Sequence, residues 1–126
     1  MKLLLDTHSF LWFIEGSTDL SSTARSLIEN GHNESLISVA SLWEIAIKHS
    51  IGKLSLSMPF QAWITSQLSD FEQLSIQMNH LSVVATLPLH HRDPCDRLLI
   101  TQAMVEKLPL VSADGAFDAY AIQRLW

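Results

Sequence analysis

Short apolar runs alternate along the chain with longer segments in which apolar residues recur at helical spacing. The short runs predict strands, because continuous apolar stretches are typical of a parallel sheet that is covered on both faces. We expect strands at residues 2–5, 36–39, 74–76 and 110–112, and an edge strand within 120–126. The run at 74–76 is the weakest of these patterns.

The segments between the strands predict helices, with glycine or asparagine at several ends and Pro59 at a first helical position. Apolar spacing places them around residues 10–14, 24–28, 42–47, 60–68, 81–87 and 94–107. This alternation predicts a doubly wound, three-layer α/β fold with a central parallel sheet of four to five strands flanked by helices. A length of 126 residues without a linker predicts one domain over residues 1–126.

Composition and cysteine content limit the class of protein. Hydrophobic residues make up 48% of the chain, which is enough for a packed core. Cys95 is the single cysteine, so an intramolecular disulfide is excluded and a reducing compartment is favoured. Asp6 interrupts the apolar start, and Glu44 and serines interrupt the stretch 36–47, so neither predicts a signal peptide or a membrane span. We expect a soluble, cytoplasmic protein without a membrane partner.

Four acids occupy informative places relative to the predicted elements. Asp6 and Asp114 follow predicted strands, and Glu44 and Asp96 lie in the first turns of predicted helices. In open α/β sheets the carboxyl ends of the strands and the N-termini of the helices share one edge, where ligands bind. Carboxylates gathered there repel unless a cation compensates them, and Mg²⁺ prefers oxygen ligands. The arrangement predicts metal-assisted phosphodiester hydrolysis with Mg²⁺ or Mn²⁺ as cofactor.

Net charge decides little about the substrate. The charge of −5 argues mildly against nucleic-acid binding, because phosphate contacts need Lys and Arg. Divalent cations held by the acids would, however, reverse the local field.

Three of the four acids also have a structural interpretation. Glu44 forms a capping-box pattern with Ser41. Asp96 would complement a helix dipole, and Asp114 would form a turn. Asp6 has no evident structural reason to follow three leucines, so it carries the most weight for a functional site.

Four segments carry a resemblance to a known family. They are Leu4-Leu5-Asp6-Thr7-His8, Ser41-Leu42-Trp43-Glu44-Ile45-Ala46-Ile47-Lys48, His91-Arg92-Asp93-Pro94-Cys95-Asp96-Arg97-Leu98-Leu99-Ile100 and Val111-Ser112-Ala113-Asp114. In order and spacing they resemble the four acidic motifs of PIN domains, and among these the VapC-type toxins of bacterial type II toxin–antitoxin systems. The resemblance runs from Met1 to Trp126.

The resemblance implies a PIN-like fold and a Mg²⁺- or Mn²⁺-dependent endoribonuclease. It also implies restraint by a cognate antitoxin protein and assembly as a homodimer. Carried over motif by motif, it makes Asp6 and Asp96 the direct metal ligands. Glu44 and Asp114 complete the catalytic site. Cys95, Ser112 and Gly115 replace residues that are common in the family, and none of these departures removes an acid.

Polar residues beside the acids admit both functional and structural interpretations. Thr7 and Ser112 would hydrogen-bond a carboxylate or only a turn. Asp93, before Pro94, is expected to be a helix N-cap with a secondary role at the site. Three nearby cations would contact RNA phosphates or remain solvated surface: Lys48, Arg92 and Arg97.

Two other functions fit the same acids. A metal-dependent phosphatase or DNA nuclease would use the same site, because a metal site does not reveal its substrate class. A PIN-like module that binds RNA or protein without cleaving it is a second alternative, and loss of an acid would be its signature. Zinc is not predicted, since the six histidines show no zinc-ligand spacing.

Overall fold

The computed structural model describes residues 1–126 and has an all-parallel sheet of five strands in the order β3-β2-β1-β4-β5. Two short 3₁₀ helices, η1 and η2, are present in addition to the strands and α-helices. The elements in chain order are β1 (Lys2–Leu5), α1 (Thr7–Glu15), α2 (Ser22–Glu29), β2 (Glu34–Ser38), α3 (Val39–Ser50), α4 (Phe60–Gln67), η1 (Leu68–Asp70), β3 (Glu72–Leu74), α5 (Met78–Val84), α6 (Pro94–Glu106), β4 (Leu110–Val111), η2 (Gly115–Ala119) and β5 (Arg124–Leu125). The predicted α/β architecture is confirmed.

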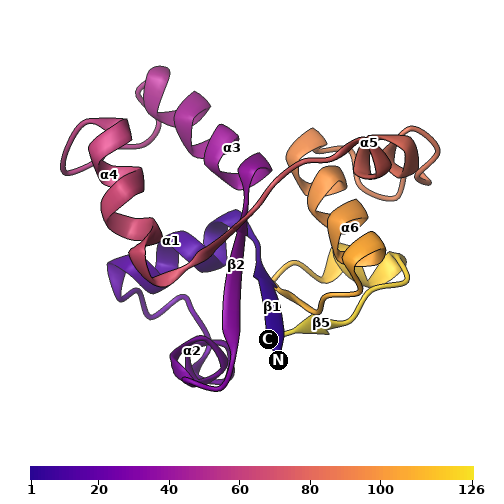
Figure 1. Cartoon of the computed structure of the whole chain (residues 1–126), viewed down its shortest axis with the longest axis horizontal. Helices are drawn as coiled ribbons and strands as arrows, with labels where there is room; N and C mark the ends of the chain where they lie inside the picture. Colours follow the sequence, from indigo (N-terminus) through magenta and orange to yellow (C-terminus); the bar gives the residue numbers. More distant parts are fainter.

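Helices cover both faces of the sheet, with α1 to α4 on one side and α5 and α6 on the other (Figure 1). Neighbouring residues of β1 point to opposite faces, so Leu3 and Leu5 pack toward α1–α4 and Leu4 packs toward α6. All three leucines are fully buried. This double coverage explains why β1 is apolar throughout instead of alternating.

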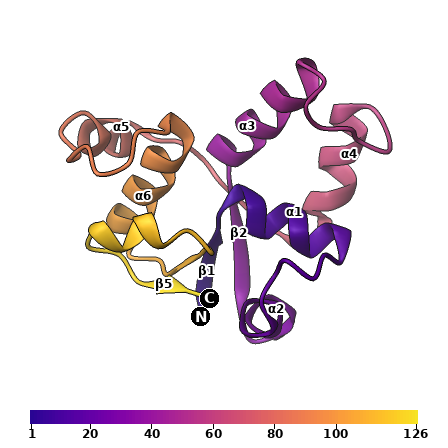
Figure 2. The same cartoon turned by 180° about the vertical axis from the view of Figure 1, so that it is seen from behind.

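The chain reverses its direction of travel across the sheet at β1 and β4, which are neighbours in space. From β1 the chain winds through β2 to β3, and it then returns to form β4 and β5 on the other side of β1. Figure 2 shows β1 between β2 on one side and β5 on the other. Ligand sites of open α/β sheets form outside the carboxyl ends of the strands at such a reversal. In register, Leu5 lies opposite both Ile37 and Val111, so the three central strands end level with one another.

Several element boundaries differ from the predicted ones. Val39 begins α3 instead of ending β2, because the Ser38 hydroxyl accepts a hydrogen bond from the Ala40 amide and caps the helix there. Strand β3 and helix α5 both begin earlier than predicted, at Glu72 and Met78. The helix η2 was not predicted at all. None of the helices has the length and apolar character that crossing a membrane requires.

Candidate metal centre

Asp6 lies at the end of the central strand β1 and begins helix α1. Its side chain is buried, and Oδ1 accepts a hydrogen bond of 2.8 Å from the Ser9 amide. Asp6 is therefore the N-cap of α1, so the expectation that it has no structural reason to be there is wrong. Capping occupies only one of its two oxygens, and the other remains available for a second role.

Glu44 lies on α3, and both of its carboxylate oxygens have partners. Oε1 accepts a 2.7 Å hydrogen bond from the Thr7 hydroxyl, and Oε2 is 2.9 Å from Lys48 Nζ. The capping-box interpretation with Ser41 is wrong, because α3 begins at Val39 and Ser41 lies inside it. Instead, the Ser41 hydroxyl lies 3.0 Å from the Thr7 hydroxyl. Thr7, directly after Asp6, thus connects the first two acids as the sequence interpretation expected.

Asp96 lies in the first turn of α6, and Asp93 is the N-cap of this helix, as predicted. The Asp93 carboxylate accepts a 2.9 Å hydrogen bond from the Asp96 amide. Burial, followed by the negative charge of Asp93, raises the pKa of the Asp96 carboxyl to about 7. Glu44 and Asp6 also raise this pKa, while His91 lowers it. All three acids therefore act electrostatically on Asp96, although they come from different elements.

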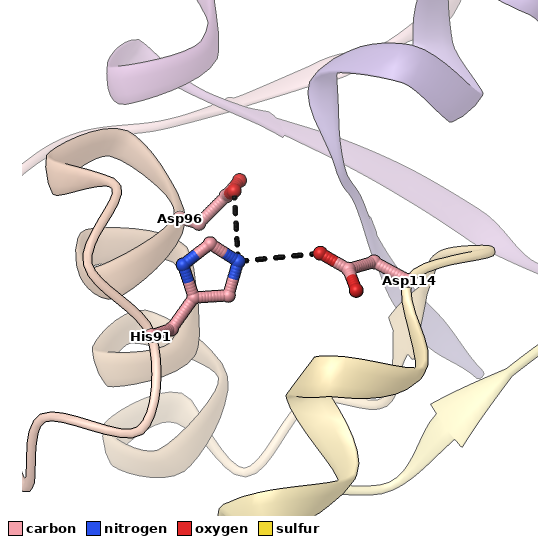
Figure 3. A group of neighbouring side chains, drawn as sticks. All are labelled: His91, Asp96 and Asp114. Atoms are coloured by element: carbon pink, nitrogen blue, oxygen red, sulfur yellow. Dashed lines mark hydrogen bonds and ion pairs between the residues drawn. The ribbon is translucent and has the colours of Figure 1, made fainter.

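Asp114 follows β4 and caps η2, its Oδ1 accepting a 2.9 Å hydrogen bond from the Ala116 amide. Its Oδ2 lies 3.2 Å from Nε2 of His91, and the same nitrogen lies 3.2 Å from Oδ2 of Asp96 (Figure 3). Ligand atoms of these three residues lie within 4.8 Å of one another. His91, Asp96 and Asp114 thus form the most compact group of possible metal ligands.

His91 is the residue of this group that sequence reasoning missed. In the sequence it is only the first residue of the segment His91–Ile100 that contains Asp96. Its position depends on the loop before α6 folding back over η2, and neither feature is visible in residue spacing. Asp6 and Glu44, by contrast, lie close enough to influence Asp96 but outside the compact trio.

The residues that were expected to support the acids or to contact RNA make different kinds of contact. The Ser112 hydroxyl accepts a 3.0 Å hydrogen bond from the Asp114 amide, so it supports the turn and makes no bond to a carboxylate. The Arg97 guanidinium donates to four backbone carbonyls of the segment before α6: Val84, Leu87, Pro88 and His91. Lys48 is paired with Glu44, while Arg92 is exposed. Arg97 therefore braces a loop, and Arg92 is the freest of the three cations proposed for phosphate contacts.

Cys95 lies beside the site but has no nucleophilic character. Burial, and then the charges of Glu44, Asp93 and Asp96, raise the pKa of its thiol to about 12. The thiolate that nucleophilic catalysis requires is consequently scarce at neutral pH. Cys95 is a buried small side chain.

The donor set suits a hard divalent cation. Carboxylate oxygens predominate, and they come from the ends of β1 and β4 and from helices α3 and α6. Burial and the negative charges around Asp96 raise its pKa. A bound cation would offset the repulsion between these charges. Oxygen ligands in such number match Mg²⁺ or Mn²⁺ better than Zn²⁺.

Metal-free protein is expected to lose stability as the pH rises from about 4 to about 7. The pKa of Asp96 is raised from 3.8 to about 7 on folding, so in this range the folded state holds the proton that the unfolded state releases. The lost stability is on the order of 4 kcal/mol at most. Urea unfolding in EDTA at several pH values measures it. Asp96→Asn should flatten this dependence, and an identical slope in the variant would contradict the assignment.

Comparison with solved structures shows what the fold resembles. VapBC2 from Rickettsia felis, bound to a DNA fragment from its promoter, aligns with a TM-score of 0.75 at 18% identity, over 100% of this chain and 99% of that chain. A toxin–antitoxin complex from Klebsiella pneumoniae gives 0.69 at 16% identity, over 98% and 96%. VapBC-5 from Mycobacterium tuberculosis gives 0.61 at 18% identity, over 98% of each chain. At these identities the likeness shows a shared fold.

Comparison with curated proteins gives no match. The sequence profile of one family, described as the PIN domain, matches residues 3–123. This match covers all four acidic segments, β1 from Leu3 onward, and all of β2, β3 and β4, while β5 lies just beyond it. The fold described above and the extent of the match lead to the same conclusion: the chain belongs to the PIN domain family.

Proposed function

We propose that the chain is a divalent-metal-dependent endoribonuclease that acts as the toxin of a type II toxin–antitoxin pair. The observation that carries the proposal is the convergence of Asp6, Glu44, Asp96 and Asp114 on one edge of the sheet, with Asp96 buried among the other charges. PIN domains are generally nucleases, which supports hydrolysis of phosphodiester bonds. The presence of every acid argues against a module that binds without cleaving.

In this proposal Asp6 and Asp96 hold Mg²⁺ or Mn²⁺, and Asp114 and Glu44 complete the site. When bound, the cation would neutralise charge on a phosphoryl oxygen and lower the pKa of a water bound to it. Thr7 fixes the rotamer of Glu44 through its hydrogen bond, and Lys48 pairs with the same carboxylate. Arg92, exposed beside the site, is the residue best placed to contact an RNA phosphate.

We also propose two protein partners, a cognate antitoxin and a second copy of this chain. Several proteins of similar fold were solved as toxin–antitoxin complexes, which supports the first partner. The second is supported by an apolar stripe along α3 and its C-cap, where Trp43, Ile47 and the cap residue Ile51 are 51%, 40% and 59% exposed at intervals of four residues. A small reading frame directly beside this gene would support the antitoxin. We place the activity in the cytoplasm, where RNA is the available substrate.

Purified protein freed of any partner is expected to cleave RNA in Mg²⁺ or Mn²⁺ and to stop when EDTA is added, because the acids alone cannot stabilise the developing charge. Gel analysis of a defined RNA measures cleavage, and restored Mg²⁺ should restore it. DNA of the same sequence and a phosphomonoester serve as matched substrates. Cleavage of DNA alone would favour the alternative nuclease, and RNA cleavage undiminished by EDTA would exclude the metal mechanism.

A further inference from the structure

His91 is held in place by contacts on every side. Its amide donates to Tyr120 Oη at 2.8 Å, and its carbonyl accepts from Arg97 at 3.1 Å. Its ring stacks on buried Phe117, with 5.4 Å between ring centroids and 26° between planes. The ring therefore points at the acids because the surrounding fold fixes it, and not because an exposed side chain settled there.

The hydrogen bonds of the ring assign its tautomer. Nδ1 lies 3.2 Å from the amide nitrogen of Asp93, and because an amide only donates, Nδ1 is the acceptor. The proton of the neutral ring is then on Nε2, which faces Asp96 and Asp114. A proton on Nδ1 would point at the Asp93 N–H. In this arrangement Nε2 donates to the Asp114 carboxylate, lies 3.2 Å from Asp96 Oδ2, and has no lone pair to offer a cation.

The two oxygens of Asp114 are already divided between two donors. Oδ1 is held by the Ala116 amide as the cap of η2, so Oδ2 is the oxygen that faces the acids. This is the oxygen that the Nε2–H of His91 holds. The Nε2–H of His91 lies between the two acids, with Nε2 3.2 Å from Oδ2 of Asp114 and 3.2 Å from Oδ2 of Asp96. A cation bound between these two carboxylates would therefore take the place that the N–H of His91 occupies.

We propose that His91 is a positioning residue that competes with the divalent cation for Asp114. In the metal-free protein its N–H is hydrogen-bonded to Asp114 and lies 3.2 Å from Asp96, so it bridges two carboxylates that would otherwise repel. Binding of a cation to Asp114 breaks this bridge. The inference rests on the proposed function, because it concerns the same metal site.

Thermodynamic linkage gives the direction in which loss of His91 changes the affinity for the cation. An interaction present only in the metal-free state lowers the apparent affinity for the cation, and its removal raises that affinity. Because hydrogen bonds to charged groups are among the stronger ones, loss of His91 should tighten cation binding by roughly ten-fold or more. A ligand role for His91 predicts the opposite, a weaker affinity.

Nitrogen NMR of the wild-type imidazoles tests the bridge without any substitution. In EDTA, His91 should show an unprotonated Nδ1 and a protonated, hydrogen-bonded Nε2. Saturation with Mg²⁺ should shift the Nε2 resonance while the tautomer is retained. Transfer of the proton to Nδ1 on Mg²⁺ binding would identify His91 as a ligand and overturn the proposal. An Nε2 resonance unaffected by Mg²⁺ would also overturn it.

Calorimetric titration with Mn²⁺ tests the competition. His91→Phe keeps an aromatic ring on Phe117 but removes the N–H, and it should bind Mn²⁺ about ten-fold more tightly than wild type. Asp114→Asn should cost at least about ten-fold more affinity in the His91→Phe background than in wild type, because only there is Asp114 free of His91. His90→Phe, at the exposed neighbouring position, is the matched control and should leave the affinity unchanged.

The outcomes separate the two proposals. Weaker or unchanged Mn²⁺ binding in His91→Phe, with binding intact in wild type, overturns the competition and leaves the proposed function standing. Absence of Mn²⁺ and Mg²⁺ binding in wild type overturns both. If His91→Phe fails to fold, His91→Leu and the wild-type NMR experiment supply the answer.

Discussion

Asp96→Asn is expected to reduce RNA cleavage by at least about 100-fold while the metal-free protein remains folded. Asparagine keeps the size of the side chain but loses the charge that would hold a cation. Burial and neighbouring acids disfavour that charge in the metal-free protein, as the pKa of about 7 shows. Stability at neutral pH should therefore be equal to or higher than that of wild type. Cleavage rates and urea unfolding in EDTA measure the two effects.

Two further variants make this result specific. Asp6→Asn should also lose cleavage, yet it should keep the fold, because asparagine caps a helix as well as aspartate does. Asp70→Asn changes an exposed acid in η1 and should cleave at the wild-type rate. Wild-type cleavage by Asp6→Asn or Asp96→Asn would refute the metal-site proposal. Loss of cleavage together with loss of folding would point to structural damage instead.

Phe10→Ala is expected to lower the free energy of unfolding by about 3–5 kcal/mol. Phe10 is fully buried on α1, and its ring meets those of Trp63 and Phe71 edge to face, at centroid distances of 6.2 Å and 5.2 Å. Truncation removes a large apolar surface and leaves a cavity between α1, α4 and the segment before β3. Urea denaturation, with the slope checked for constancy, measures the loss.

Met78→Ala is the exposed control for this substitution. Met78 is also a large apolar residue on a helix, but 77% of it is exposed on α5. Its truncation should change stability by less than about 1 kcal/mol. Equal losses in the two variants would mean that the core has been misplaced.

The sequence was sufficient for the order of elements because the central strands β1, β2 and β4 carry buried residues on both faces. Leu3, Leu4 and Leu5 must be covered from two sides, and only intervening helices can do this for parallel strands. Boundaries were harder to predict. Val39 is β-branched and follows an apolar run, which is typical of a strand, but the hydroxyl of Ser38 decides that the helix has already begun. A single hydrogen bond outweighs the pattern there.

For the four acids, too, the sequence predicted one aspect correctly and another wrongly. Their placement after strands and near helix starts predicted that Asp6, Glu44, Asp96 and Asp114 would meet at one edge, and they do so in the fold. The sequence misjudged what else each one does. Asp6 caps α1, and Glu44 is bonded to Thr7 and Lys48 instead of serving a capping box.

By itself, the sequence determined the parallel sheet, the edge at which four carboxylates gather, and the N-cap Asp93. These features depend on apolar patterns within short segments of the chain and on the rule that parallel strands end at the same edge of a sheet. Only the tertiary structure decided that His91 bridges Asp96 and Asp114, because this contact joins a loop, a helix start and a turn that are distant along the chain. The positions of such groups depend on packing against Phe117 and Tyr120, which residue spacing does not encode.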